Sequence, residues 1–587
     1  MIAAAVVAGY QIAIAAVRAL QVRIVSIDLL VTVAAIGALF IENYWESAAV
    51  TFLFVLGKTL EKATLNKTRK ALSDLVDAAP ETATVLRDGE PVSVEVWELA
   101  PGDIVLVRNG EQIPVDGRVV SGHGGVDEAT ITGESLPAEK VEGSETFAGT
   151  WLRSGVLQVE AVAIGPNTTL AKIIHRVEEA QDDKAKTQTF LEKFSKWYTP
   201  GVIGGSLLVG FIARDIELGL TLLVIGCPGA LVISIPVSIV AGIGRAAKDG
   251  VLIKGGEYLE RAAKVDAVVV DKTGTLTKGR PELTDVIVLD PAYTTDEVLR
   301  FAARAETASE HPLAAAIIQG AKERGLEVEI VEKALPVAGK GIHATVDGRE
   351  VVVGSADLLD DAPDDSALIE LNEHGKTAMY VGVDGKAIGI VAVADTIRDD
   401  APAAIQALHK AGVRVVMATG DAKRVAEHIA LELGVDEVHA ELLPEDKLAL
   451  VRQLQSEGHT VAMMGDGVND TPALAQSDIG VAMGAAGSPA AIETADIALM
   501  ADNLPRLAYA LGLAQRTVRT MRINIAIALV TVAALLAGVL FGGVTMSLGM
   551  LVHEGSVFLV IGIAMLLLRP TLKEREGLSV LSPGASG

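Results

Sequence analysis

The stretch "VDAVVVDKTGTLTKG", residues 265–279, decides the fold of the largest polar segment of the chain. A run of β-branched residues, typical of a buried strand, ends at Asp271, and small, polar, glycine-containing sequence follows it. Similar apolar runs, "GVRVVMATG" and "TVAMMGDG", occur later and alternate with helical stretches such as "AKRVAEHIALELG". Strands that alternate with helices predict a parallel, doubly wound sheet between about residues 250 and 515.

Aspartates stand at or just after the ends of three predicted strands: Asp271, Asp421 and Asp466. One such aspartate is usually a helix cap or a turn residue. In an open parallel sheet, however, the functional crevice lies at the carboxyl ends of the strands, where all three would converge. Such a cluster suits phosphoryl transfer, with one carboxylate as the nucleophile and others holding Mg²⁺. We therefore expect Asp271 to be the nucleophile, among small and polar neighbours: Thr273, Gly274, Thr419, Gly420, Gly465, Gly467, Asn469 and Asp470.

The composition indicates a membrane protein with large polar domains. At 587 residues the chain exceeds what one hydrophobic core usually supports. The hydrophobic fraction is 50% and the mean hydropathy +0.41, although 21% of the residues are charged. Several apolar stretches reach the roughly 20 residues that a membrane helix needs. The candidate stretches are residues 1–17, 27–40, 45–57, 198–213, 218–244, 523–541 and 547–568.

Basic residues cluster at one side of these stretches, so the positive-inside rule places both long polar segments in the cytoplasm. We expect a plasma (inner) membrane protein. Seven spans would leave residue 1 outside, unless an upstream helix is missing or the first stretch is not a true span. The formal net charge of −25 argues against nucleic-acid binding, because no basic stripe offsets it.

The only cysteine, Cys227, lies beside Pro228 within an apolar stretch, so no intrachain disulfide can form. A lone buried cysteine is usually a small hydrophobic residue. A proline inside a membrane helix, however, frees carbonyl oxygens, and a thiolate is a soft metal ligand. These two residues alone leave both interpretations open, a small hydrophobic residue and a metal ligand within the membrane.

Four motifs give the chain a family resemblance. "TGES" (132–135), "DKTGTLT" (271–277), "TGD" (419–421) and "GDGVNDTPAL" (465–474) follow the order found in P-type ATPases, which the chain resembles over essentially its whole length. The resemblance implies an α-helical membrane bundle, a β-rich actuator domain, a haloacid-dehalogenase-like α/β phosphorylation domain and an inserted α+β nucleotide-binding domain. The implied segments are membrane helices in 1–63, the actuator with its connections in 64–195, two membrane helices in 196–246, phosphorylation parts in 247–280 and 389–515, the nucleotide domain in 281–388, two membrane helices in 516–570, and a cytoplasmic tail in 571–587.

In this family scheme ATP phosphorylates Asp271. The resemblance implies that Asp271, the Thr273 carbonyl and Asp466 coordinate Mg²⁺. It implies that Glu134 positions the water that hydrolyses the phosphoenzyme, although "TGES" standing alone would be read as a surface turn. Residues implied to contact the phosphoryl group or support its neighbourhood are Thr419, Asp421, Lys447, Asn469 and Asp470.

The stretch "ETASEHPL", residues 306–313, resembles the nucleotide-site motif of heavy-metal-transporting P-type ATPases, with Glu306 and His311 near the adenine. Three glycines match further positions that line the site in this subfamily, although a lone glycine pair of this kind is more often a turn. These glycines are Gly339, Gly341 and Gly354.

"GCPGAL", residues 226–231, stands where the subfamily has its ion-binding motif, often CPC or SPC. Here the third residue is Gly229, so one expected thiol is absent. The last apolar stretch contains "HEGS", and a buried ionisable group there is a functional candidate, unless His553 lies hydrated near the interface. A similar histidine–glutamate motif occurs in the cobalt, zinc and iron branch. Cys227, His553 and Glu554 together suit a borderline divalent ion such as Zn²⁺, Co²⁺, Cd²⁺, Fe²⁺ or Mn²⁺.

We therefore expect a monomeric, ATP- and Mg²⁺-dependent pump in the lipid bilayer that exports a divalent transition metal. A pump for copper(I) or another cation would share every cytoplasmic motif, and Met546 and Met550 offer soft sulfur ligands, although such methionines are more often packing residues. A phosphohydrolase or metal sensor that does not transport would share the aspartate site, but it would not need polar residues inside the membrane.

Overall fold

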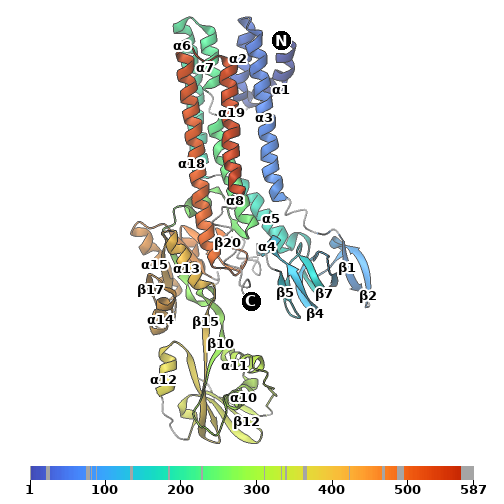
Figure 1. Cartoon of the computed structure of the whole chain (residues 1–587), viewed down its shortest axis with the longest axis vertical. Helices are drawn as coiled ribbons and strands as arrows, with labels where there is room; N and C mark the ends of the chain where they lie inside the picture. The colour runs from blue at the N-terminus through green and yellow to red at the C-terminus, as the bar shows by residue number, and fades with distance from the viewer. Residues whose placement is uncertain are drawn as a thin grey trace. The chain divides into compact units, whose positions relative to one another are not determined.

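The computed structural model describes the chain apart from residues 1, 22–26, 74–79, 81, 88, 133–136, 183–184, 227–228, 310, 332, 338–339, 361–365, 422, 466–469, 485–494 and 570–587. The chain forms two compact units (Figure 1). The first comprises Met1–Lys264, Gly484–Asp502 and Tyr509–Gly587, and the second comprises Val265–Met483 and Asn503–Ala508.

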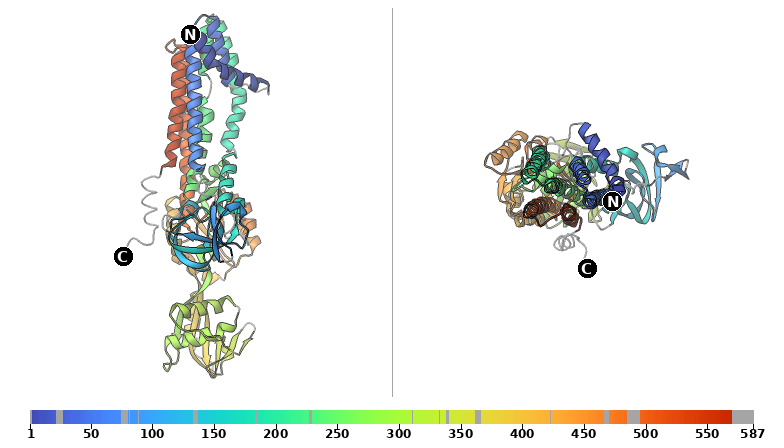
Figure 2. Two further views of the ribbon diagram at one scale, coloured as in Figure 1. Left: turned by 90° about the vertical axis from the view of Figure 1, so that its right-hand side faces the viewer. Right: turned by 90° about the horizontal axis from the view of Figure 1, so that it is seen from above.

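The first unit contains the apolar helices (Figure 2). Among the described residues, three helical segments are long and apolar enough to cross a membrane: Ile216–Lys248, Pro505–Leu540 and Met546–Leu568. Three of the other predicted stretches form shorter apolar helices, Ala5–Gln21, Ile27–Phe40 and Trp197–Ala213. The helices are α1 (Ile2–Gln21), α2 (Ile27–Phe40), α3 (Tyr44–Ser73), α6 (Lys186–Ala213), α7 (Ile216–Ile225), α8 (Gly229–Lys248), α18 (Pro505–Leu540) and α19 (Met546–Met565).

Polar side chains join these apolar helices inside the bundle. The fully buried Asn524 of α18 donates from its amide nitrogen to Ser238 Oγ of α8 at 3.3 Å and to the Val560 carbonyl of α19 at 3.2 Å. Glu46 of α3 accepts from the Ser547 hydroxyl at the start of α19, at 3.0 Å. Such bonds are worth on the order of 1 kcal/mol each in a membrane, and they fix which faces of the helices meet.

Residues 82–163 form the β-rich domain that the sequence predicts. Its seven-stranded antiparallel sheet has the order β2-β1-β3-β7-β4-β5, with β6 paired to β4. Alternating apolar residues such as Val105, Val107, Leu157 and Val159 fill its core. The strands are β1 (Thr82–Arg87), β2 (Glu90–Glu95), β3 (Ile104–Arg108), β4 (Asp116–Asp127), β5 (Ala138–Lys140), β6 (Glu145–Thr146) and β7 (Trp151–Ala163), with the helices α4 (Ala129–Thr132) and α5 (Thr169–Asp182).

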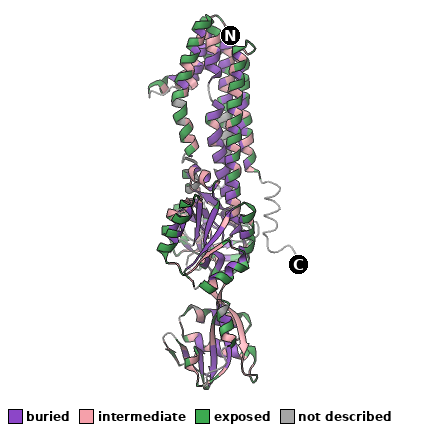
Figure 3. Cartoon of the chain, turned by 90° about the vertical axis from the view of Figure 1, so that its left-hand side faces the viewer, coloured by how far each residue is buried: buried purple, intermediate pink, exposed green. Residues whose placement is uncertain are grey.

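The predicted parallel sheet lies in the second unit, in the order β17-β16-β9-β18-β19. Its strands are buried almost throughout (Figure 3) except for the edge strand β17, which explains the continuous apolar runs of the others. The elements are β9 (Ala267–Asp271), α13 (Ala401–Lys410), β16 (Arg414–Ala418), α14 (Lys423–Leu433), β17 (Glu437–His439), α15 (Pro444–Ser456), β18 (Val461–Gly465), α16 (Thr471–Gln476) and β19 (Ile479–Ala482).

The segment between β9 and α13 builds a second, antiparallel sheet in the order β10-β15-β14-β13-β12-β11. The chain enters this sheet on β10 (Thr277–Val288) and leaves it on the neighbouring β15 (Lys386–Ile397). A buried cluster that includes Phe301 and Ile317 packs the helices of this segment onto the sheet. The remaining elements are α10 (Thr295–Ala305), α11 (Pro312–Glu323), β11 (Ala334–Val337), β12 (Gly341–Val346), β13 (Arg349–Gly354), α12 (Ser366–Glu373) and β14 (Thr377–Val383).

Candidate functional site

Asp271 is the last residue of the central strand β9, which pairs in parallel with β16 on one side and β18 on the other. The strand is buried throughout, and Asp271 itself is only 7% exposed. Directly after it the backbone turns at Gly274, whose φ of +70° lies in the left-handed region that favours glycine. The sheet thus holds one carboxylate rigidly at its carboxyl edge, as the sequence predicts.

Lys447 of α15 connects two of the predicted carboxylates. Its ammonium group donates to Asp271 Oδ1 at 2.6 Å and to Asp470 Oδ1 at 2.8 Å, and all three side chains are buried. Burial raises the pKa of Asp271 to about 6, and the charge of Asp470 adds to the rise, while Lys447 opposes it. Burial alone would lower the pKa of Lys447, but its two carboxylate partners hold it above the usual value.

Asp470 reaches this centre because β18 ends in a glycine. A Cβ atom at Gly465 would lie 2.2 Å from Asp470 Oδ2, so any side chain there would collide with the carboxylate. Among the described residues, Asp470 Oδ2 has no hydrogen-bond partner, although Asp470 is only 1% exposed. Carboxylate oxygens are the ligands that Mg²⁺ prefers. The donor set of Asp271 and Asp470 therefore fits a magnesium ion.

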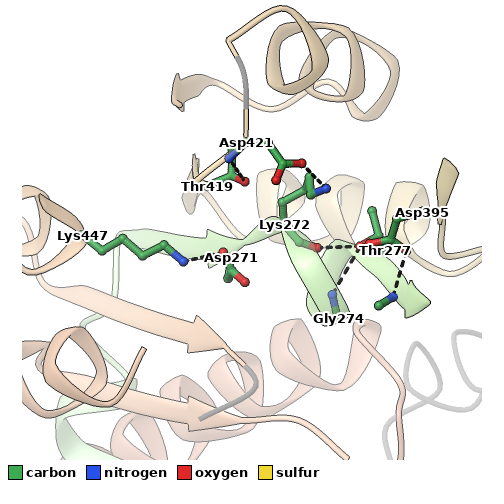
Figure 4. A network of polar contacts seen from close by, with 9 residues as sticks. Asp271, Lys272, Gly274, Thr277, Asp395, Thr419, Asp421 and Lys447 are labelled. Carbon is green, nitrogen blue, oxygen red and sulfur yellow. Dashed lines mark hydrogen bonds and ion pairs between the residues drawn. The ribbon is translucent and has the colours of Figure 1, made fainter. Parts of the chain in front are cut away.

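Lys272 and Asp421 form a second ion pair at the same edge of the sheet (Figure 4). Thr419, 1% exposed, accepts a hydrogen bond at Oγ1 from the Asp421 backbone nitrogen at 3.1 Å. Because this bond uses only an acceptor site of the hydroxyl, its proton remains available for a phosphoryl oxygen. The structure thus places Thr419 and Asp421 beside the residue that follows Asp271.

Asp395 was not among the residues that the sequence singled out. It accepts from Thr277 Oγ1 at 2.5 Å and from the Gly279 backbone nitrogen at 2.9 Å (Figure 4). These bonds tie β15 to β10 where both strands leave the parallel sheet. Asp395 follows the apolar run "AIGIVAVA", so the criterion of an aspartate near a strand end would have found it.

In the inserted segment, Glu306 follows α10 and is only 7% exposed. Burial raises its pKa to about 7, and a hydrogen bond with Ser309 opposes the rise only in part. His311 is exposed and caps α11, since its Nδ1 accepts from the Leu313 backbone nitrogen at 3.3 Å. A buried carboxyl group whose pKa is strongly raised is a candidate binding residue.

Gly341 and Gly354 face each other across β12 and β13. A Cβ atom at Gly341 would lie 2.0 Å from the Val353 carbonyl oxygen, and one at Gly354 would lie 2.0 Å from the Lys340 carbonyl oxygen. Their φ values of +137° and +154° also disfavour other residues. The close approach of the two strands therefore requires both glycines, whether or not they line a ligand site.

In the membrane helices, His553 and Glu554 of α19 are buried, at 4% and 8% exposure. Each points its polar tip at a glycine of another helix. A Cβ atom at Gly229 of α8 would lie 2.8 Å from His553 Nε2, and one at Gly57 of α3 would lie 1.9 Å from Glu554 Oε2. Both side chains are therefore packed between helices of the bundle. His553 Nδ1 has no hydrogen-bond partner among the described residues.

Five of the predicted site residues lie outside the described residues: Glu134, Cys227, Gly339, Asp466 and Asn469. On either side of Glu134, α4 ends at Thr132 and β5 begins at Ala138. Lys140 of β5 forms an ion pair at 2.8 Å with Glu128, the residue before α4.

Comparison with known proteins identifies the family. Residues 77–178 match the P-type ATPase actuator domain, and residues 265–478 match the haloacid dehalogenase-like hydrolases. A probable cadmium-transporting ATPase of Alkalihalophilus pseudofirmus is 42% identical over 552 residues, which cover 90% of this chain and 76% of that protein. The chain belongs to the heavy-metal-transporting P-type ATPases.

Two further relatives support the assignment. The P-type ATPase resembles the crystal structure of a zinc-transporting PIB-type ATPase in the E2.Pi state, with 39% identity and a TM-score of 0.65, over 97% of this chain and 94% of that one. It is also 44% identical over 503 residues to a probable copper-exporting P-type ATPase V of Mycobacterium tuberculosis, covering 83% of this chain and 65% of that protein. As a P-type ATPase, the chain is a multi-pass membrane enzyme that couples ATP hydrolysis to the transport of a heavy-metal ion.

Proposed function

We propose that this P-type ATPase exports a divalent transition-metal ion of the zinc and cadmium class through phosphorylation of Asp271. The observation that carries the proposal is the pair His553 and Glu554, buried side by side on a membrane helix with their polar tips against glycines. Holding a charge at the centre of a membrane helix costs about 2.5–3.5 kcal/mol on insertion scales, so such a pair marks an ion pathway. Similarity to cadmium- and zinc-transporting relatives supports the same ion class.

In the proposed chemistry, a carboxylate oxygen of Asp271 attacks the γ-phosphorus of ATP. The bond between the γ-phosphorus and the β–γ bridging oxygen breaks, and ADP leaves. Water then attacks the phosphorus of the aspartyl-phosphate, which releases inorganic phosphate and restores the carboxylate. Glu134 orients this water. When bound, Mg²⁺ would neutralise charge on the phosphoryl oxygens. Asp271, the Thr273 carbonyl and Asp466 would hold the ion, with Asp470 as a further carboxylate beside it.

The other residues of the centre position the phosphoryl group. Lys447, already charged between two carboxylates, balances negative charge as the phosphoryl group arrives. The Thr419 hydroxyl donates a hydrogen bond to a phosphoryl oxygen. The ion pair between Lys272 and Asp421 keeps Lys272 away from Asp271. Asn469 and Asp470 support this arrangement. In the nucleotide domain, Glu306 and His311 contact the adenine, with Gly339, Gly341 and Gly354 lining the site.

The proposed ligands of the transported ion are the Cys227 thiolate, the His553 imidazole and the Glu554 carboxylate. Sulfur, nitrogen and oxygen donors in one site suit Zn²⁺, Cd²⁺ or Co²⁺ better than copper(I), which prefers several sulfurs. Met546 and Met550 are 0% and 1% exposed and pack in an apolar cluster with residues such as Leu30 and Val224. Their packing favours a structural role over a role as sulfur ligands. Similarity to a copper-exporting relative keeps copper(I) as the second candidate ion.

The test measures ATP hydrolysis by purified protein in lipid vesicles with Zn²⁺, Cd²⁺, Co²⁺, Fe²⁺, Mn²⁺ and Cu⁺. The wild type is compared with Cys227→Ala and Glu554→Ala, and Met550→Leu is the control for a buried sulfur outside the proposed site. We expect stimulation by one or a few divalent ions, at least tenfold weaker in the first two variants and retained in the third. Stimulation by Cu⁺ alone, or equal rates in all variants, would refute the proposed ligands.

A further inference from the structure

A side chain at position 229, the third residue of the Cys-Pro-Gly sequence, would compete with His553 for the same volume. A Cβ atom at Gly229 would lie 2.8 Å from His553 Nε2 and 3.5 Å from His553 Cε1. Real Cβ atoms essentially never come within 3.0 Å of another heavy atom, so a side chain at 229 would have to displace the imidazole. Because His553 is 4% exposed, it has little room to move.

Glu554, the next residue of α19, has the same relation to another helix. A Cβ atom at Gly57 of α3 would lie 1.9 Å from Glu554 Oε2 and 2.5 Å from Glu554 Cδ. The carboxylate tip therefore occupies the space that the smallest side chain at position 57 would take. Other glycines of the same bundle, such as Gly562 on α19, have open space where a Cβ atom would lie.

We infer that Gly229 and Gly57 are specificity-determining residues: they reserve space for an imidazole and a carboxylate and so exclude a second thiolate from the ion site. The inference rests on the proposed function. A cysteine at 229 would have to push the tip of the His553 imidazole out of its present place, so this packing favours a histidine nitrogen over a second thiolate. Mixed nitrogen and oxygen donors beside one thiolate suit borderline divalent ions, whereas two adjacent thiolates favour a soft ion such as Cu⁺.

The first experiment exchanges the occupant of the shared volume. Gly229→Cys, His553→Ala and the double variant Gly229→Cys/His553→Ala are assayed for ATP hydrolysis with Zn²⁺, Cd²⁺ and Cu⁺ in lipid vesicles. Each single variant is expected to lose at least tenfold of the Zn²⁺ stimulation. The double variant is expected to regain metal stimulation, now strongest with Cu⁺, because the cysteine enters the space that the imidazole leaves.

A second set of variants separates the effect of filling the space from the effect of adding a thiol. Gly229→Ala adds a Cβ atom without a thiol and is expected to lose stimulation as Gly229→Cys does. Gly57→Ala should lose it as well, and Gly57→Ala/Glu554→Asp should regain part of it, since aspartate is one methylene shorter. Gly562→Ala is the matched control and should behave as the wild type. Phosphorylation by inorganic phosphate, which needs no transported ion, reports whether each variant is folded.

The outcomes separate a failure of the proposed function from a failure of the inference about Gly229. If no metal stimulates the wild type, the proposed function fails. If the wild type responds to divalent ions but Gly229→Cys responds equally well, or the double variant is no better than its single parents, the inference about Gly229 is wrong. If Gly229→Cys does not fold, the double variant Gly229→Ala/His553→Ala decides the inference. A folded double variant supports the claim that residues 229 and 553 share one volume, and an unfolded double variant overturns it.

Discussion

Replacing Glu306 by glutamine tests the electrostatics of the nucleotide domain. Glu306 is buried after α10, and burial raises its pKa from 4.5 to about 7. Below pH 4.5 the carboxyl group is protonated in both the folded and the unfolded state, so it costs nothing. As the pH rises from 4.5 to 7 the unfolded state loses this proton first, so the stability of the domain falls. Above pH 7 the whole penalty applies.

Each unit of pKa corresponds to about 1.4 kcal/mol, so the ionised Glu306 destabilises the folded domain by about 3 kcal/mol at pH 8. Glutamine keeps the shape and carries no charge. We therefore expect Glu306→Gln to raise the free energy of local unfolding by about 3 kcal/mol at pH 8 and to have little effect near pH 4.5. At pH 8 this equals about two orders of magnitude in protection from hydrogen exchange.

The assay is hydrogen exchange of peptides from α10 and α11 in the whole protein, corrected for the intrinsic rate at each pH. Glu297→Gln on the same helix is the control with the opposite sign. Hydrogen bonds from Thr294 lower the pKa of Glu297, so its stabilising effect is present at neutral pH and is lost as the pH falls. Equal protection of wild type and Glu306→Gln at pH 8 would refute the reasoning.

Three further perturbations test other contacts. Lys447→Met leaves Asp271 and Asp470 buried without their cation, so phosphoenzyme formation from ATP should fall at least a hundredfold. Near-normal labelling of the variant protein by radioactive ATP would contradict this prediction. Asp395→Ala removes both hydrogen bonds that the Asp395 side chain accepts from the start of β10, so the KM for ATP should rise several-fold while phosphorylation by inorganic phosphate persists. An unchanged KM would argue against a positioning role for Asp395. Asn524→Leu should destabilise the membrane helices by about 1 kcal/mol in thermal unfolding. A more stable variant would show that the cost of burying Asn524 Oδ1, which has no partner in the part of the chain that the structure describes, outweighs these bonds.

The sequence predicted most of the fold because the signals are local. Continuous apolar runs such as "AVVV" before Asp271 mark buried parallel strands, and hairpin turns mark the β domain. The rule that parallel strands end at one edge of a sheet predicted a carboxylate cluster around Asp271, and Asp470 lies there. Lys447, which bridges the two carboxylates from α15, was expected only from the family resemblance. The prediction that Cys227 and Glu134 join the sites remains a prediction.

Other features depend on contacts between distant residues. Nothing near Gly57 in sequence shows that it faces Glu554, because the two belong to helices separated by hundreds of residues. Gly229 was recognised only as a missing thiol, and its contact with His553 requires the packing of α8 on α19. The close pairing of β12 and β13 gives Gly341 and Gly354 a structural reason that the sequence does not show, and their place in the nucleotide site remains a prediction.

The chain enters and leaves the nucleotide segment on adjacent strands, with Thr277 paired to Ile397 and Pro281 to Asp395. Cα atoms paired in this way lie about 5 Å apart, a gap that a two-residue turn closes. The inserted module can therefore be excised and the two strands rejoined without stretching the phosphorylation fold. Another module would meet the same geometric condition at this junction if its two ends emerged as neighbouring strands.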